Sequence, residues 1–228
     1  MSTSHPGLDI ANLVVSYGKA PVLRGIDLQV PEGQIAAVLG ASGSGKTTLL
    51  RSIAGFIRPK SGNIKVDHRT LVGPGVWLAP ERRDVGLVPQ EGALFPHLDV
   101  AGNVGFGLPK RTRAQRTEAA ARVEQLLEFV SLGGKGAVQP HELSGGMQQR
   151  VALARALARE PNVVLLDEPF SALDAELRRE LRGQVRELLA QAGTTAILVT
   201  HDEDEALDFA DAVHRISDGR IVESPEGE

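Results

Sequence analysis

Residues 34–51, Gln34-Ile-Ala-Ala-Val-Leu-Gly-Ala-Ser-Gly-Ser-Gly-Lys-Thr-Thr-Leu-Leu-Arg51, join an apolar run to a glycine-rich loop and a helical pattern. Residues 34–39 are nearly all apolar, as in a strand buried on both faces of a parallel sheet. Residues 40–47 fit G-x-x-x-x-G-K-[ST], in which the glycines let successive backbone N–H groups turn toward phosphate oxygens. The N-terminus of the following helix adds its positive dipole end. The segment therefore predicts a phosphate-binding loop.

The expected roles of this loop follow from the chemistry of nucleoside triphosphates. Lys46 should reach the β- and γ-phosphates of ATP, and the Thr47 hydroxyl should occupy one position around Mg²⁺. The alternative is a flexible Gly/Ser turn, which the flanking strand and helix patterns disfavour. The residues expected to bind the nucleotide here are Gly40, Ala41, Ser42, Gly43, Ser44, Gly45, Lys46, Thr47 and Thr48.

A second buried strand ends in two acids, Val163-Val-Leu-Leu-Asp-Glu168. Beside a phosphate loop, we expect Asp167 to coordinate Mg²⁺ through water and Glu168 to polarise the water that attacks the nucleotide. Two acids at a strand end can instead cap a following helix. The presence of the phosphate loop favours the catalytic interpretation.

The rest of the chain alternates strand and helix patterns. Leu8, Ile10, Leu13 and Val15, and then residues 26–30, alternate with period two, as in antiparallel strands. Apolar runs at 85–88, 163–166 and 195–199 are typical of parallel strands. Helical spacing appears in two further sets: Val123, Leu126, Leu127 and Val130, and, with one slip, Leu177, Leu181, Val185 and Leu188.

These patterns predict an α/β fold with a parallel sheet. The stretch from Glu91 to Arg155 contains no strong strand pattern and is expected to form a helical insertion. Residues 213–216 and 220–223 flank Ser217-Asp218-Gly219, which predicts a hairpin. The tail Ser224–Glu228 is expected to be loose.

The composition limits the function classes. The chain has 228 residues, of which 42% are hydrophobic and 4% aromatic, so its core must consist mainly of aliphatic side chains. A net charge of −4 and a pI of about 5.9 argue against nucleic acid as a partner, since that requires a basic face. The absence of cysteine excludes disulfides and thiol chemistry. We expect no signal peptide and no spanning helix, so that any membrane role comes through a partner.

One further motif narrows the family. Leu143-Ser-Gly-Gly-Met-Gln-Gln-Arg150 resembles the LSGGQ signature of ABC ATPases. Ser144 can cap a helix while Gly145 and Gly146 leave backbone amides bare, so that a second anion-binding helix N-terminus exists on one chain. The alternative is a routine Ser-capped helix. In ABC ATPases the signature of one copy faces the phosphate loop of the other, so the resemblance implies a head-to-tail homodimer with two MgATP between the copies.

Other positions match the same family from about Leu8 to Val222. By resemblance, Tyr17 stacks on adenine, Gln90 reaches Mg²⁺ and the attacking water, Asp174 of Ser171-Ala-Leu-Asp174 crosses the dimer interface, and His201 contacts the γ-phosphate. Three of them have a simpler alternative: Tyr17 as a packing residue, Gln90 as a solvated strand-end glutamine and His201 as a structural histidine. The other five histidines match nothing, and we find no metal-ligand cluster.

The resemblance implies one P-loop NTPase domain over residues 1–228. Residues 1–90 and 156–228 would form an antiparallel β subdomain and a RecA-like parallel-sheet core, and 91–155 an inserted α-helical subdomain carrying the signature.

The segment after Gln90 resembles ATPases of bacterial importers, of the ferric-iron, polyamine or sulfate group; Glu91-Gly-Ala-Leu-Phe-Pro-His-Leu98 is closest to the ferric-iron type. This implies permease subunits as partners, a substrate-binding protein acting through the permease, and a peripheral location at the cytoplasmic face of the inner membrane. Phe95, Leu98 and Phe106 form either an apolar socket for the permease or subdomain core.

Three questions stay open at this stage. Importer ATPases of this group usually continue into a C-terminal regulatory domain, so the chain is either truncated or a short relative. A soluble ABC ATPase working on ribosomes or DNA is an alternative, although such proteins usually carry tandem units or a long coiled-coil insertion. A second alternative is an exporter subunit, although the ATPase of an exporter is often fused to its membrane domain.

Overall fold

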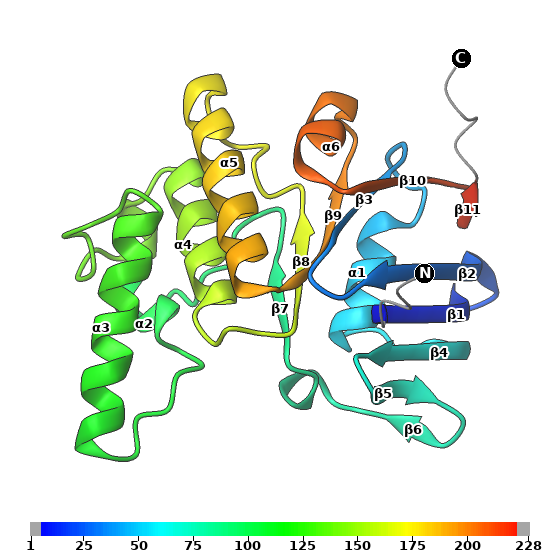
Figure 1. The fold of residues 1–228 in the computed structure, drawn as a ribbon, viewed down its shortest axis with the longest axis horizontal. Coiled ribbons are helices and arrows are strands. Elements are labelled where there is room, and N and C mark those ends of the chain that lie inside the picture. Colours follow the sequence, from blue (N-terminus) through cyan, green and yellow to red (C-terminus); the bar gives the residue numbers. More distant parts are fainter. Residues whose placement is uncertain (1–5, 223–228) are drawn as a thin grey trace. The chain divides into compact units, whose positions relative to one another are not determined.

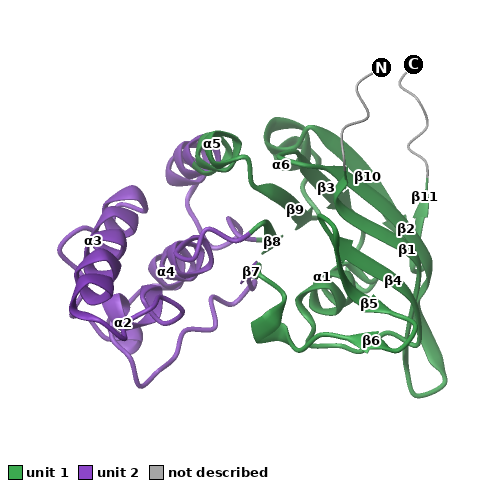
Figure 2. Cartoon of the chain, turned by 60° about the horizontal axis from the view of Figure 1, so that its bottom comes forward, with its two compact units in different colours: residues 1–85, 162–168, 185–228 green, residues 86–161, 169–184 purple. Residues whose placement is uncertain are grey.

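The computed structural model of the chain describes residues 6–222 (Figure 1). The tail for which we expected a loose conformation lies outside the described residues. The chain divides into two compact units: unit 1 comprises residues 1–85, 162–168 and 185–228, and unit 2 comprises residues 86–161 and 169–184 (Figure 2).

The first layer of unit 1 is an antiparallel sheet with the strand order β2-β1-β4-β5-β6. Its strands are β1 (Pro6–Tyr17), β2 (Ala20–Pro31), β4 (Ser61–Val66), β5 (Arg69–Gly73) and β6 (Val76–Trp77). The apolar pattern of β1 is interrupted because Asn12 has a φ of 48° and the register shifts between Ile10 and Leu13. This bulge keeps Ile10 and Leu13 both buried although they are three residues apart.

The second sheet of unit 1 is mostly parallel, with the order β11-β10-β3-β9-β8. It contains β3 (Ile35–Leu39), β8 (Val163–Asp167), β9 (Thr195–Thr200), β10 (Ala212–Ser217) and β11 (Arg220–Val222). Every residue of β3, β8 and β9 is buried, as the continuous apolar runs predict. The predicted hairpin is confirmed, since β10 and β11 pair antiparallel through a turn in which Asp218 and Gly219 both have positive φ.

The helices of unit 1 lie against these sheets. Helix α1 (Lys46–Ala54) contacts β8 of the parallel sheet and β2 of the antiparallel sheet. Helix α6 (Glu203–Phe209) packs on β3 and β9. A 3₁₀ turn, η1 (Pro80–Arg82), precedes β7 (Val85–Val88), which runs from the end of unit 1 into unit 2.

Unit 2 is mainly helical, with α2 (Val100–Val104), α3 (Arg113–Phe129) and α4 (Gly145–Leu157) in mutual contact. The 3₁₀ turn η2 (Pro140–Glu142) leads into α4, and α5 (Ala175–Ala192) passes from unit 2 into unit 1. Leu126 and Leu127 of α3 are buried as their spacing predicts. In α5 the buried residues are Leu181, Val185 and Leu189, which follow strict i, i+4 spacing. Leu188, which we expected to be buried, is only partly so.

The predicted α/β class is confirmed by this arrangement of sheets and helices. Within residues 6–222, no helix combines the length and the apolar character that crossing a bilayer requires.

The buried strands should dominate the stability of unit 1. Leu198 in β9 is 0% exposed, so Leu198→Ala should lower the free energy of unfolding by about 2–5 kcal/mol through lost burial and a residual cavity. Leu207→Ala is the matched control, because Leu207 is 64% exposed and its loss should cost no more than about 0.5 kcal/mol. Urea denaturation followed by circular dichroism measures both; similar midpoints for the two variants would contradict the assignment of β9 to the core.

Candidate nucleotide site

The loop between β3 and α1 depends on one glycine conformation. Gly45, the residue before α1, has a φ of 111°, a region that residues with a Cβ rarely adopt. A Cβ at this position would also lie 2.8 Å from Leu23 Cδ2. The chain therefore turns sharply from the buried strand into the helix only because residue 45 is glycine.

The N-terminus of α1 has no side-chain cap, and no acidic residue lies in its first turn. By contrast, α2, α3, α4 and α6 are each capped by a side chain, from Asp99, Thr112, Ser144 and Asp202 respectively. The first N–H groups of a helix have no intrahelical acceptor, so an uncapped N-terminus suits an anion. Within the described residues, the buried Ser44 hydroxyl also has no hydrogen-bond partner. Both features fit a phosphate group at this loop.

Lys46 lies over the loop that it follows. Its Nζ donates hydrogen bonds to the backbone oxygens of Gly40, at 2.6 Å, and Ala41, at 3.1 Å, and the residue is only 7% exposed. The ammonium is therefore held at the phosphate loop by carbonyl groups.

The structure brings Thr47 and Asp167 together. The Thr47 hydroxyl, in the first turn of α1, donates a hydrogen bond of 3.3 Å to Asp167 Oδ1 at the end of β8. Burial raises the pKa of the Asp167 carboxyl above its ordinary value, and the neighbouring Glu168 charge acts in the same direction. The hydrogen bond from Thr47 and the charges of Arg51 and Lys46 oppose this rise of the pKa. A hydroxyl and a carboxylate side by side are oxygen ligands of the kind that Mg²⁺ takes together with substrate phosphates.

Glu168 and His201 form a second pair. The Nδ1 atom of His201 lies 3.2 Å from Glu168 Oε1, and the Glu168 side chain is 16% exposed while that of His201 is 66% exposed. Glu168 has a φ of 47°, an uncommon conformation for a glutamate, and its N–H donates to the Val199 carbonyl. Backbone strain of this kind is concentrated at functional sites. The pair joins an acid that has limited access to solvent to an accessible imidazole.

Strand register explains why these segments meet. In the parallel sheet Leu39 lies beside Thr200, and Val199 lies beside Asp167. The three strands therefore end at the same edge, and the phosphate loop, the acid pair and His201 follow directly from those ends. Tyr17, at the end of β1, is 54% exposed, so one of its faces is accessible to a flat ligand.

In unit 2, the predicted signature residues begin α4. The Ser144 hydroxyl accepts a hydrogen bond from the Met147 N–H, as its role as helix cap requires. A Cβ at Gly145 would meet no atom within 4 Å, whereas one at Gly146 would lie 3.1 Å from the Ala172 carbonyl. The backbone of Gly145 is thus open to the outside, and Gly146 allows the close approach of residues 172–173.

Asp174 and Gln149 form hydrogen bonds at the loop before α5. Gln149 was not among the predicted site residues. Asp174 Oδ1 accepts a hydrogen bond from the Leu177 N–H at the start of α5. Gln149 is 2% exposed, and its side-chain oxygen accepts the N–H of Ala172 at 3.2 Å. Because this contact joins residues 23 positions apart, no local pattern in the sequence predicts it.

The loop after Gln90 is held by a second residue that the sequence analysis missed. Gln90 is exposed and follows β7 after one residue. The Arg155 guanidinium donates to the carbonyls of Gly92 and Ala93 and lies 5.1 Å from the Phe95 ring centre. Burial lowers the pKa of Arg155, because desolvation disfavours the charged guanidinium. No local pattern predicts these contacts, because they join residues more than sixty positions apart.

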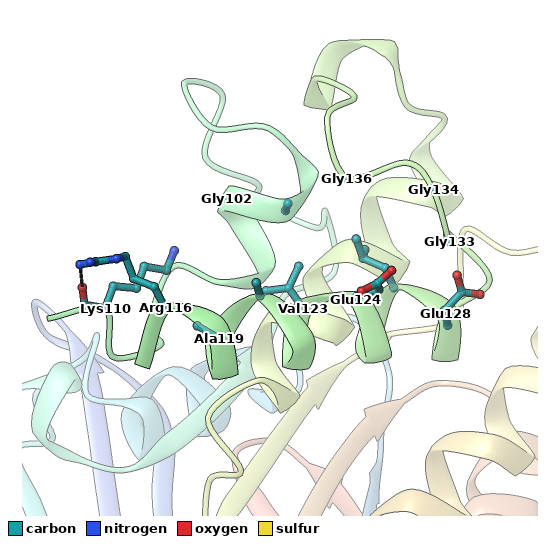
Figure 3. Close-up of a pocket in the computed structure, with 13 residues that line it drawn as sticks. Gly102, Lys110, Arg116, Ala119, Val123, Glu124, Glu128, Gly133, Gly134 and Gly136 are labelled. Atoms are coloured by element: carbon teal, nitrogen blue, oxygen red, sulfur yellow. Dashed lines mark hydrogen bonds between the residues drawn. The ribbon is translucent and has the colours of Figure 1, made fainter. Parts of the chain in front are cut away.

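Unit 2 also carries a groove of about 550 Å³ along α3. Its floor consists of small and apolar side chains, including Ala119 and Val123, while Lys110 and Arg116 lie towards one end and Glu124 and Glu128 towards the other (Figure 3). None of the predicted nucleotide-binding residues lines it. The remaining lining residues are Ala101, Gly102, Ala120, Leu127, Gly133, Gly134 and Gly136.

The family described as "ABC transporter" matches residues 23–171, more than half of the chain. The chain belongs to the ABC transporter family. Its sequence is 53% identical over 217 residues to the Fe(3+) ions import ATP-binding protein FbpC 2 of Rhodococcus jostii (strain RHA1), covering 95% of this chain and 61% of the relative. It is 50% identical to the FbpC protein of Serratia marcescens, covering 95% of this chain and 62% of the relative. The ABC chain thus spans about three fifths of the length of these relatives.

Solved structures of ABC cassettes have the same fold. A dimeric post-hydrolysis state of the ATP-binding cassette MJ0796 bound to ADP and Pi is 28% identical, with a TM-score of 0.83, covering 97% of this chain and 100% of that chain. A second dimeric structure of MJ0796, described as a bacterial ABC transporter cassette, is 29% identical, with a TM-score of 0.84 and the same coverage. The P-loop NTPase fold of the ABC ATPases, expected from the sequence, is therefore confirmed.

The buried charge of Asp167 should lower stability when no ligand is bound. Because the folded state raises the pKa of this acid, keeping it ionised costs free energy at neutral pH, and the cost disappears below the ordinary value of 3.8. Asp167→Asn keeps an oxygen for Thr47 and should therefore raise Tm at pH 7.5 without nucleotide or metal. The gain should shrink as the pH falls towards 4.

Differential scanning fluorimetry across this pH range measures the effect. Asp218→Asn is the control, because Asp218 lies in an exposed turn whose positive φ asparagine tolerates. An equal gain for both variants would refute the burial argument.

Proposed function

We propose that this ABC chain binds and hydrolyses ATP and that this reaction powers a bacterial importer. The observation that carries the proposal is the uncapped N-terminus of α1 beside the Thr47–Asp167 pair. A helix N-terminus that no side chain caps suits the phosphates, and the adjacent hydroxyl and carboxylate suit a divalent cation. The nucleotide-binding roles of residues 40–48 and of Tyr17, on whose exposed ring adenine would stack, belong to this proposal.

Mg²⁺ fits this set of ligands, with Thr47 and Asp167 as its protein contacts and Gln90 as a further ligand that the family resemblance implies. When bound, Mg²⁺ neutralises charge on the β- and γ-phosphate oxygens. Thr47 and Asp167 orient the nucleotide, and Lys46 adds a positive charge close to the phosphates. The raised pKa of Asp167 means that a bound cation would stabilise its ionised form.

Glu168 and His201 have the complementary roles in hydrolysis. Glu168 accepts a hydrogen bond from the attacking water and so increases its nucleophilicity. His201, 3.2 Å from Glu168, holds this carboxylate in place and has an exposed imidazole that can reach the γ-phosphate. By the family resemblance, Gln90 would orient the same water.

Two copies of the chain should act together. Besides the uncapped N-terminus of α1, the chain has that of α4, where Ser144 caps the Met147 N–H but the backbone of Gly145 stays open to a ligand. We propose that Ser144, Gly145 and Gly146 of one copy bind the γ-phosphate of ATP held by the second copy, with Asp174 near the interface. Dimers of the related cassette MJ0796 support this assembly.

Glu168→Gln tests hydrolysis and dimerisation together. Loss of the carboxylate should lower the rate of ATP hydrolysis by about 10²–10⁴-fold while leaving ATP binding intact, so that a stable dimer accumulates. Size-exclusion chromatography with MgATP should show that dimer. Lys46→Ala is the control, since it removes the phosphate contact; ATP-dependent dimers of Lys46→Ala would contradict the proposed arrangement.

The transported cargo that we propose is ferric iron. The support is that relatives at 50–53% identity are named Fe(3+) ions import ATP-binding proteins. The partners would be permease subunits, with a substrate-binding protein acting through them, and the chain would lie peripherally at the cytoplasmic face of the membrane. The deciding measurement is uptake of radiolabelled ferric iron by cells that lack this gene; unchanged uptake would remove iron as cargo.

The groove along α3 and the aromatic pair Phe95–Phe106 are the surfaces we propose for the permease. The rings of Phe95 and Phe106 lie 4.4 Å apart, and Phe106 is 59% exposed, which favours a docking surface over subdomain core. The groove has an apolar floor between basic and acidic ends (Figure 3). A helix of the permease with an apolar face and oppositely charged ends would complement this groove.

Two neighbouring alanines test the groove. Ala120 lines it and is exposed, whereas Ala121 is exposed but does not line it. Ala120→Trp should fill the groove and abolish co-purification with the permease from membranes, while Ala121→Trp should retain it. Equal recovery of permease by the two variants would exclude the groove, and recovery with ribosomes would favour a soluble ABC ATPase outside transport.

A further inference from the structure

Arg83 is the largest of the fully buried side chains of the described structure, with an exposure of 1%. It follows η1 and lies two residues before β7. Burial lowers its pKa to about 10, so it remains charged at neutral pH. None of the ion pairs of the described residues includes it, and its Nη2 atom has no hydrogen-bond partner there. The guanidinium is thus a buried cation without a carboxylate.

The partners of Arg83 are backbone carbonyls at the C-terminal end of α1. Its Nη1 donates to the oxygens of Ser52 and Ile53, both at 2.8 Å, and its Nε donates to the Leu78 oxygen at 2.8 Å. The last carbonyls of a helix have no intrahelical donor. The Arg51 oxygen accepts the N–H groups of residues 55–57, so Arg83 satisfies the next two carbonyls along the chain.

Two neighbours of the Arg83 guanidinium are Gly55 and Trp77. Gly55 ends α1 with a φ of 93°, and a Cβ at this position would overlap the Arg83 guanidinium. On another side the Trp77 ring centre lies 5.9 Å from Arg83 Cζ, and Arg58 Cζ lies 5.8 Å from the same ring centre. The Arg83 side chain therefore connects the C-terminal end of α1 to the segment 77–83.

Stability alone does not account for a charge at this place. A buried cation without a counter-ion carries a desolvation cost, and an apolar side chain of similar volume often serves stability equally well or better. A guanidinium differs from an apolar group in that its planar array of donors fixes several carbonyls in direction as well as in distance. The property specific to Arg83 is thus the orientation of α1.

That orientation matters at the other end of the same helix. Helix α1 has nine residues, from Lys46 to Ala54, and its first turn carries the phosphate-binding backbone and Thr47. A short helix behaves as a rigid rod, so a tilt at Ile53 displaces the N–H groups at Lys46 and Thr47 by a comparable distance. Small displacements of positioning groups have large effects on ligand alignment.

We propose that Arg83 is a positioning residue that fixes α1 from its C-terminal end and thereby aligns the phosphate loop for ATP. The inference rests on the proposed ATP binding and hydrolysis. Arg83 touches neither the nucleotide loop nor the acid pair; it acts through α1. Its loss should therefore weaken ATP binding most, because the displaced first turn of α1 carries the phosphate contacts. The chemical step should suffer less, since Glu168 and His201 lie outside α1.

Arg83→Lys is the test variant, because lysine keeps the charge but cannot reach the carbonyls of Leu78, Ser52 and Ile53 together. We expect the KM for ATP and the equilibrium dissociation constant to rise on the order of tenfold, with kcat falling by a smaller factor. Gly55→Ala is the second variant, since it crowds the guanidinium without removing it, and it should raise KM in the same direction. It also serves if Arg83→Lys does not fold.

Leu71→Ala is the stability control. Leu71 is 0% exposed in β5 of the same unit, and its backbone hydrogen bond with the Leu78 N–H is kept when its side chain is shortened. All variants are measured at temperatures equally far below their own Tm. If Leu71→Ala raises KM as much as Arg83→Lys, or if both Arg83→Lys and Gly55→Ala keep the wild-type KM, the positioning role is refuted.

Lys46→Ala separates this inference from the proposed function on which it rests. If the wild-type chain binds ATP no more tightly than Lys46→Ala, the proposed function fails and the inference fails with it. If wild type binds ATP well and the Arg83 variant binds it equally well, the proposed function stands and only the role of Arg83 is refuted.

Discussion

The shared register of β3, β9 and β8 is the constraint on which the nucleotide site depends. Because Leu39 pairs with Thr200 and Val199 with Asp167, the three parallel strands end at one edge of the sheet. Segments far apart in the sequence thus become neighbours without any loop having to reach across the unit. The same burial that stabilises these strands fixes the groups that follow them, so stability and site geometry have one origin.

In unit 2, helix α4 has a comparable organising role, but side chains rather than strand register carry it. Gln149 holds the loop before α5, Arg155 holds the loop after Gln90, and the Gln148 side chain donates to the carbonyls of Pro140 and Leu143. These bonds go from polar side chains to backbone groups of irregular segments, which gives loops the fixed shape that binding requires. One helix thereby sets the conformation of three separate segments.

The sequence was informative where a physical requirement leaves a local pattern. Continuous apolar runs identified the parallel strands, and the glycines of residues 40–45 identified the turn into α1. The pairing of Thr47 with Asp167 follows from those two patterns together. By contrast, some buried polar side chains bind carbonyl or amide groups that only folding brings near them. No spacing in the sequence predicts these contacts, which are those of Gln149, Arg155 and Arg83. The bulge at Asn12 and the burial of Leu189 instead of Leu188 depend on packing details of the same kind.

The position of the single tryptophan has a practical consequence. Trp77 is the only tryptophan of the chain, and its ring centre lies 5.8 Å from Arg58 Cζ and 5.9 Å from Arg83 Cζ. It is 38% exposed, so its indole senses both solvent and the charges on its faces. The tryptophan fluorescence of the unmodified chain therefore reports on one site, next to the arginine that binds the C-terminal end of α1. Rearrangements near the C-terminal end of that helix can thus be followed by intrinsic fluorescence, without attaching a dye.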